Sequence, residues 1–192
     1  MLQGEFLYEG KAKKIYATDN PSLVWIAYKD DATAFDGTKR GTIANKGIVN
    51  NRVSNMLFKY LETQGIETHL VEQIDDRNTI VKKLRILPIE VVVRNVVAGS
   101  LANRVGLPEG AELPQTILEL YYKNDDLHDP MINEYHARAL GWAGDQELDE
   151  IKRQALRINE ILREFYDRIG IILVDFKLEF GEFEGRIILG DE

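Results

Sequence analysis

Cysteine is the residue type that this chain of 192 residues lacks entirely. Its absence excludes disulfide bonds and thiolate chemistry, and it makes a reducing cytoplasm the compartment that we expect. Basic charge is also scarce, because 24 lysines and arginines stand against 32 aspartates and glutamates, for a formal net charge of −8. A general nucleic-acid surface needs a basic face, so we expect no nucleic acid as a partner.

Long apolar runs are missing too. The longest ones are far too short to span a bilayer, so we expect no membrane partner. The opening MLQGEFLYEG has no basic stretch followed by an apolar one, and so predicts no secretion signal. The residues that are present, 44% apolar and 29% charged, are typical of a globular protein with one domain, or two small ones sharing a core.

The first half of the chain predicts strands around one helix. Residues 30–41, DDATAFDGTKRG, predict a loop, and residues 66–86 predict a strand pair around the turn DDRN. Residues 45–64 have helical apolar spacing, with Gly65 as the stop. Three short strands come first, at residues 5–9, 13–18 and 23–29. The helical spacing is that of Val49, Val53, Met56, Leu57, Tyr60 and Leu61.

The second half predicts two more strands, a long helix and a hairpin. A strand is entered through Pro88, and ILELYYK at 117–123 predicts another. A long amphipathic helix follows, with Asp145 as its N-cap and Gly170 just past its end. The hairpin IILVDFKLEF and RIILG closes the chain. Because strands mostly pair locally with helices set against them, the pattern favours an α+β fold.

Two motifs are candidates for anion binding. In GKAKK, Lys11 and Lys13 alternate, so an extended loop points both ammonium groups the same way, although a solvated hairpin tip explains them as well. In EVVVRNVVAGS, Glu90 and Arg94 share one strand face, and Ser100 is placed to cap a short helix. Capping alone explains Ser100, but it does not explain the arginine on the strand leading to it.

The acidic loop KNDDLHDP, at 123–130, holds a histidine and three aspartates, which are candidates for a functional site. An ordinary solvated loop explains this composition as well.

The stretch DFKLEFG is more specific, because Asp175, Lys177 and Glu179 alternate with apolar residues along one strand. If the strand ending in Asp191 folds back on it, two carboxylates come within reach of one Mg²⁺.

The register of that hairpin is itself a prediction. A two-residue turn at Glu184-Gly185 would pair Glu179 with Gly190 and turn Asp191 to the apolar face. A shared metal needs both carboxylates on one face. We therefore predict a one-residue adjustment, either a longer loop or a bulge near Gly185 or Gly190.

These stretches resemble a known family. PIEVVVRNVVAGS and LVDFKLEFG are similar to two signature stretches of the SAICAR synthetases, and YEGKAKKIY, HDPM and LGDE follow in the family's order and spacing. The resemblance implies an N-terminal antiparallel sheet lobe at 1–84 and a larger lobe at 85–192 related to ATP-grasp enzymes and kinases. It also implies an ATP-dependent ligase that joins L-aspartate to carboxyaminoimidazole ribonucleotide, in a homodimer that uses Mg²⁺.

The resemblance also implies roles for single residues. Lys11 and Lys13 match positions that hold ATP phosphates, and Glu179 and Asp191 match magnesium ligands. The positions expected at the adenine pocket are Lys82, Leu84 and Glu90. The positions that match the ribonucleotide site are Arg94, Ser100, Asp175 and Lys177. Asp129 and Asp36 are expected near the substrate carboxylates. The expected catalytic residues are Lys177, Asp175 and Asp129, with Asp175 and Asp129 as the candidate bases for the amine.

The family continues after GDE with a Ser-Pro-Asp segment and helices, which add an arginine to the phosphate site. The resemblance therefore implies that these 192 residues lack that segment. Two other functions stay open from the residues alone. A small-molecule kinase would share the lysines and the metal pair but would not need Arg94 or Ser100. A non-enzymatic binding module would leave the charged strand as a solvated face and would not bind Mg·ATP.

Overall fold

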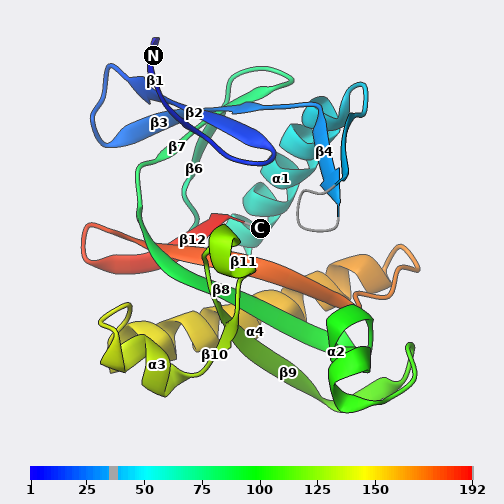
Figure 1. Ribbon diagram of the computed structural model, residues 1–192. Helices are drawn as coiled ribbons and strands as arrows, with labels where there is room; N and C mark the ends of the chain where they lie inside the picture. The colour runs from blue at the N-terminus through cyan, green and yellow to red at the C-terminus, as the bar shows by residue number, and fades with distance from the viewer. Residues whose placement is uncertain (35–38, 192) are drawn as a thin grey trace. The chain divides into compact units, whose positions relative to one another are not determined.

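The computed structural model describes residues 1–34 and 39–191 (Figure 1). These residues group into two compact units, Met1–Arg85 and Ile86–Glu192. Helices and antiparallel strand pairs occur in both units, which confirms the α+β fold predicted from the sequence. None of the helices in this described part of the chain is long and apolar enough to cross a membrane.

The first unit is built on an antiparallel sheet whose described strands follow the order β1-β2-β3-β7-β6. Its strands are β1 (Gln3–Glu9), β2 (Lys13–Thr18), β3 (Leu23–Tyr28), β6 (Leu70–Gln73) and β7 (Asn78–Lys82). Alternate side chains of β2, β3 and β7 form its buried apolar core, as the period of a strand requires. The core residues are Ile15, Val24, Ile26, Tyr28 and Val81.

A further strand pair follows β3, so the prediction of a loop over 30–41 was wrong. β4 (Asp31–Ala34) pairs antiparallel with β5 (Lys39–Thr42). The pattern hides this pair, because the segments DATA and KRGT lack the alternating apolar residues by which a half-buried strand is recognised. Asp36, a predicted substrate contact, lies outside the described residues.

The helix of the first unit, α1 (Lys46–Thr63), forms where the spacing predicted it, but it buries a different face. Val49, Val53 and Met56 are exposed, whereas Asn51 and Asn55 are buried. The reason is a hydrogen-bond network with the sheet. The Asn55 amide donates to the Thr79 hydroxyl at 2.7 Å, and that hydroxyl donates to the Asn51 amide oxygen at 2.6 Å. Polar side chains can be buried once they are paired in this way.

The second unit holds another sheet, whose described strands follow the order β10-β9-β8-β11-β12. The strands are β8 (Arg85–Val96), β9 (Glu112–Tyr122), β10 (Met131–Ile132), β11 (Asp175–Phe183) and β12 (Arg186–Asp191). The helical elements are α2 (Gly99–Val105), the 3-10 turn η1 (Asp125–Leu127), α3 (Glu134–Ala139) and α4 (Asp145–Asp167). In Figure 1, α4 runs along this sheet, and the Gln154 amide donates to the carbonyl of Ile187 in β12.

The long helix α4 confirms most of its predicted stripe but begins differently. Leu148, Ile151 and Ile158 are buried as expected, whereas Ile169 lies beyond the helix and is exposed. The predicted N-cap, Asp145, is the first helical residue, because Gly144 is the cap and donates its N–H to the Glu147 carboxylate at 2.7 Å. Glycine has no side chain that could cap the helix, so the side chain of the residue three positions later bonds the N–H at the N-cap instead.

The closing hairpin has the predicted one-residue adjustment. Phe180 pairs with Leu189, but the next pair is Glu179 with Asp191, so the register shifts by one residue beside Gly190. The turn itself keeps two residues, Glu184 and Gly185, both with positive φ as a tight hairpin turn requires. The bulge therefore sets Glu179 and Asp191 directly opposite each other.

Candidate functional site

One face of the second sheet carries several of the predicted site residues. In the register of β8 and β9, Glu90 lies opposite Tyr121 and Val92 lies opposite Glu119. Arg94 is two residues beyond Val92, so it points to the same face, as predicted. The other face is apolar, because Val91, Val93 and Phe180 are fully buried. The strand period thus separates a charged face from the core.

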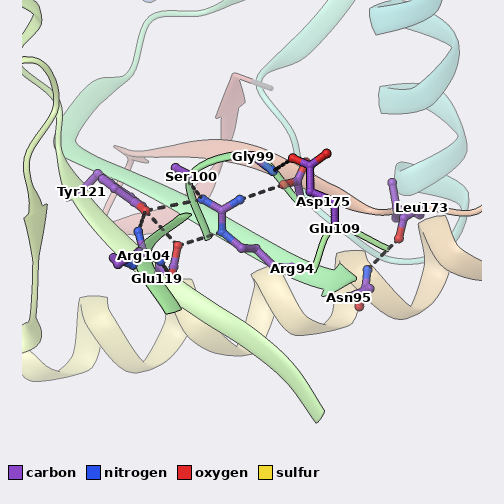
Figure 2. A network of polar contacts seen from close by, with 10 residues as sticks. All are labelled: Arg94, Asn95, Gly99, Ser100, Arg104, Glu109, Glu119, Tyr121, Leu173 and Asp175. Atoms are coloured by element: carbon purple, nitrogen blue, oxygen red, sulfur yellow. Dashed lines mark hydrogen bonds and ion pairs between the residues drawn. The ribbon is translucent and has the colours of Figure 1, made fainter. Parts of the chain in front are cut away.

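The first group of charged residues on this face is an arginine cluster. It is defined here as Arg94, Ser100, Arg104, Glu119, Tyr121 and Asp175 (Figure 2). The Arg94 side chain is 8% exposed, and it donates from Nε to Glu119 at 2.8 Å and from Nη1 to Asp175 at 2.8 Å. Burial alone would lower the pKa of Arg94, but the hydrogen bonds to Glu119 and Tyr121 outweigh it and raise that pKa. The guanidinium is therefore a permanent cation.

Glu119 is a residue that the sequence analysis missed, and it joins two arginines. Its carboxylate accepts from Arg94, from Arg104 Nη2 and from the Tyr121 hydroxyl at 2.8 Å. The signal in the sequence was faint: Glu119 is the acidic residue of the strand ILELYY, and Tyr121 follows it on the same face. Its two arginine partners lie 15 and 25 residues away, beyond the reach of local patterns.

One expectation for this cluster needs correction. Ser100 is not the N-cap of α2, because Ala98 is; Ser100 lies in the first turn and accepts from Arg94 Nη2 at 3.1 Å. The Gly99 N–H of the same turn donates to the Glu109 carboxylate at 3.0 Å (Figure 2). Asp175, a predicted ribonucleotide contact and candidate base, accepts from Arg94 Nη1. Both residues are therefore tied to the arginine.

The second group is a lysine cluster, defined here as Glu90, Lys123, Lys177 and Glu179. Lys177 donates to Glu90 and lies 3.7 Å from a Glu179 oxygen, whereas Lys123 donates to the other Glu179 oxygen. The carboxylate side chains are 9% and 8% exposed, but the two lysines are 44% and 42% exposed. Buried anions are thus held by accessible cations.

The protonation of Lys177 follows from its neighbours. Burial would lower its pKa, but the hydrogen bond to Glu90 and the charges of Glu179 and Asp129 raise it. Lys177 therefore stays a cation and is not a general base. Glu90, which the resemblance placed at an adenine pocket, is in the structure the anion that holds this lysine.

The pair Glu179 and Asp191 fits a magnesium ion by its chemistry. Direct cross-strand partners have Cβ atoms about 5 Å apart and point to one face, and both side chains are carboxylates. Within residues 1–34 and 39–191, no three histidine, aspartate or glutamate side chains form a metal site. A protein donor set of two carboxylates is what Mg²⁺ uses when substrate phosphates and water supply its other ligands.

Asp129 closes the loop before β10. Its carboxylate accepts the Asn124 N–H at 2.8 Å, and its own N–H donates to the Asn124 carbonyl at 3.1 Å. Asp129 and His128 both have positive φ, which is costly for residues other than glycine. Because its charge raises the pKa of Lys177, Asp129 belongs to the surroundings of the lysine cluster.

The first unit carries the remaining predicted residues. Lys11 lies in the turn between β1 and β2, and Lys13 begins β2 with its ammonium 5.0 Å from the centre of the Tyr28 ring. The base of this turn is fixed by Lys29, which bonds Glu9 and Asp31. Lys82 donates to Glu67 and to the Thr68 carbonyl, and Leu84 is half-buried just before β8.

Comparisons with known proteins agree over the whole chain. The SAICAR synthetase family model matches residues 6–192. A phosphoribosylaminoimidazole-succinocarboxamide synthase of Desulfitobacterium hafniense (strain Y51) is 56% identical over 192 residues, which cover 100% of this chain and 81% of that protein.

Solved structures match as well. A SAICAR synthetase in complex with ADP has a TM-score of 0.94 and 54% identity, with 98% of this chain and 80% of that chain covered. A Saccharomyces cerevisiae SAICAR synthase in complex with SAICAR has a TM-score of 0.81 and 26% identity, with 98% and 72% covered. With the charged face, the hairpin register and these matches in agreement, the chain belongs to the SAICAR synthetase family.

Proposed function

We propose that this chain, an ATP-dependent ligase of purine biosynthesis by its family, forms its amide bond through an acyl phosphate. The substrates are L-aspartate and carboxyaminoimidazole ribonucleotide. The observation that carries the proposal is the charged face of the second sheet, where Arg94, Lys177 and the pair Glu179 and Asp191 stand together on β8, β11 and β12. Such a face suits substrates that all carry negative charge.

The chemistry explains why ATP is needed. A carboxylate is a poor acyl donor, so the γ-phosphoryl group first passes to a carboxylate oxygen of the ribonucleotide, which gives an acyl phosphate and ADP. The aspartate amine then attacks the acyl carbon, the C–O bond to phosphate breaks, and phosphate leaves with its electron pair. The new amide nitrogen loses a proton. The protein contributes position and charge neutralisation.

For ATP, we propose that Lys11 and Lys13 bind the phosphates and that Lys82 and Leu84 contact the adenine. The position of the two lysines at the turn between β1 and β2 supports the first assignment. When bound, Mg²⁺ would neutralise phosphate charge and align the phosphates, and Glu179 and Asp191 would hold it. The adenine role implied for Glu90 is weaker, since its carboxylate bonds Lys177.

For the ribonucleotide, we propose that Arg94, Ser100 and Lys177 bind its anionic groups. Arg94 and Ser100 are joined by a hydrogen bond, and Lys177 keeps its positive charge, which supports the binding of an anion beside them. Asp36 stays a predicted contact of a substrate carboxylate. The candidates for the amine proton are Asp175 and Asp129, because Lys177 is excluded as a base.

A product assay with calorimetry tests this proposal. We expect SAICAR and ADP to form when ATP, L-aspartate and the ribonucleotide are all present, and Mg·ATP to bind without the other two. A small-molecule kinase would phosphorylate the ribonucleotide without consuming aspartate, and a binding module would not bind Mg·ATP. Oxygen-18 in the ribonucleotide carboxylate should appear in the released phosphate; its absence there would overturn the acyl phosphate.

The predicted homodimer and cytoplasmic location complete the proposal. Sedimentation velocity over a range of concentrations would measure the assembly state, and a fluorescent fusion would locate the chain in the cell. A monomer at all concentrations would contradict the first prediction.

A further inference from the structure

We propose that Glu119 is a positioning residue for the ribonucleotide site: it fixes the orientation of Arg94 and Arg104 so that their outer edges face one phosphate group. This inference rests on the proposed role of Arg94. Glu119 has no role in the proposed mechanism. The ligand group that the two arginines would bind is a phosphate monoester.

The contacts of Glu119 come from three elements. Its Oε2 atom accepts from Arg94 Nε on β8 at 2.8 Å and from the Tyr121 hydroxyl on β9 at 2.8 Å. Its Oε1 atom accepts from Arg104 Nη2 on α2 (Figure 2). The Tyr121 hydroxyl also accepts from Arg104 Nη1 at 3.1 Å. One carboxylate and one hydroxyl therefore tie two guanidinium groups to the sheet.

Burial makes this carboxylate a fixed part of the fold. The Glu119 side chain is 9% exposed, so its charge has lost most of its water and depends on the two arginines. Charge-assisted hydrogen bonds of this kind are strong and directional. Without Glu119, two guanidinium groups would face each other with no anion between them, and each would lose the bond that sets the plane of its fork.

The two carboxylates on Arg94 differ in access, and this difference shows which edge a ligand meets. Asp175 is 36% exposed against 9% for Glu119, although both lie 2.8 Å from Arg94. The Nε edge is therefore closed by the protein, and a ligand approaches from the side of Nη1, Nη2 and Ser100. The terminal nitrogens on this side are themselves bonded to Asp175 and Ser100, so an anion that reaches the planar fork would take the place of the exposed Asp175.

Arg104 adds a second cation of a different kind. Its side chain is 36% exposed in the last turn of α2, and it reaches the same carboxylate as the buried Arg94. The two arginines and the two carboxylates sum to zero charge. A dianionic phosphate at the exposed edges therefore meets a site without net charge. The orientation of the two guanidinium groups, rather than net charge, then sets the affinity of the site for phosphate.

Glu119→Gln in the full chain tests the proposal, since it keeps size and one acceptor but removes the charge. We expect KM for the ribonucleotide to rise about tenfold, while KM for ATP and kcat change less than about twofold. The matched control is Glu112→Gln, an exposed acid on the same strand, which should leave all constants unchanged. Glu119→Asp, which keeps the charge, should recover part of the ribonucleotide affinity.

A structural role would give a different result. If Glu119→Gln lowers the melting temperature but leaves the ribonucleotide KM unchanged, or raises the KM of every substrate alike, the positioning role is refuted. Should the variant fail to fold, Tyr121→Phe removes only the hydroxyl from the same network, and it should raise the ribonucleotide KM alone, by about twofold to threefold. The wild-type product assay comes first: no SAICAR there refutes the proposed function instead.

Discussion

Each of the two clusters on the second sheet buries a glutamate, but the two clusters hold it with different cations. In the arginine cluster, Glu119 is 9% exposed and is held by Arg94, itself 8% exposed. In the lysine cluster, Glu179 is 8% exposed and is held by Lys123, which is 42% exposed. A buried carboxylate needs a cation in every state of the protein. The two clusters differ in whether another cation can replace the one that holds the carboxylate.

Side-chain chemistry explains the division of work. A guanidinium is planar and bonds a carboxylate at fixed angles, whereas an ammonium is a point charge on a flexible stem. The arginine cluster is therefore suited to holding the shape of a site. The lysine cluster is suited to exchange, because its lysines are accessible; in the proposed function, a metal ion that arrives with ATP takes the place of a lysine at Glu179.

The largest loss of activity is expected at Glu179, where the proposed metal ion takes the place of a lysine. Glu179→Gln removes one of two proposed metal ligands and leaves Lys123 without its anion. We expect kcat/KM for ATP to fall at least about 100-fold, and the Mg²⁺ concentration for half-maximal activity to rise. Steady-state kinetics across a magnesium series would measure both. Glu182→Gln, on the same strand, is the control; an equal loss there would contradict the assignment.

The next largest effect is expected for the two lysines that we propose bind the phosphates of ATP. Lys11→Ala or Lys13→Ala should weaken ATP by about 1.5–3 kcal/mol, the value of a charge-assisted contact. Ribonucleotide binding should stay unchanged, since we propose that the turn between β1 and β2 contacts the polyphosphate alone. Calorimetry with each ligand in turn would show the split. Equal weakening of both ligands would place the turn elsewhere.

A smaller effect is expected when an arginine is replaced within its cluster. Arg94→Lys keeps the charge but lacks the fork that reaches Glu119, Asp175 and Ser100 together. We expect ribonucleotide affinity to fall roughly tenfold, with little change for ATP. Arg157→Lys, on the exposed face of α4, controls for the chemistry of the exchange. Unchanged ribonucleotide binding in Arg94→Lys would refute the role of the fork.

The bulge at the lysine cluster could be predicted from the sequence, whereas the role of Glu119 in the arginine cluster could not. The bulge beside Gly190 was predictable, because the strand period and the need for two carboxylates on one face leave only a one-residue shift. Glu119 was hidden, because its role depends on the register of β8 with β9, which shifts between Arg94 and Val96. Local patterns contain no such long-range register.

The buried face of α1 was hidden for a related reason. Periodicity ranks residues by hydrophobicity, so it favoured Val49 and Val53 over Asn51 and Asn55. Thr79, on a strand that follows later in the chain, accepts from the Asn55 amide and donates to the Asn51 amide oxygen, which links the two buried asparagines to the sheet. Sequence patterns thus predict elements well and predict polar contacts between distant elements poorly, and the charged face of the second sheet consists of such contacts.

The smallest expected effect tests exchange directly. Lys123 donates to Glu179, so it competes with a metal for that carboxylate. Lys123→Gln should leave Glu179 with Lys177 at 3.7 Å and should therefore bind Mn²⁺, used alone as a probe, about threefold more tightly. Calorimetry without nucleotide would measure this, and Lys123→Arg, which keeps the charge, should not show the gain. The parallel change in the other cluster, Arg104→Gln, should leave Mn²⁺ affinity unaltered, because Glu119 is buried and Arg94 still holds it. If Lys123→Gln binds Mn²⁺ no better than the wild type, then Lys123 is not the exchangeable cation, and the difference between the clusters has no bearing on the metal.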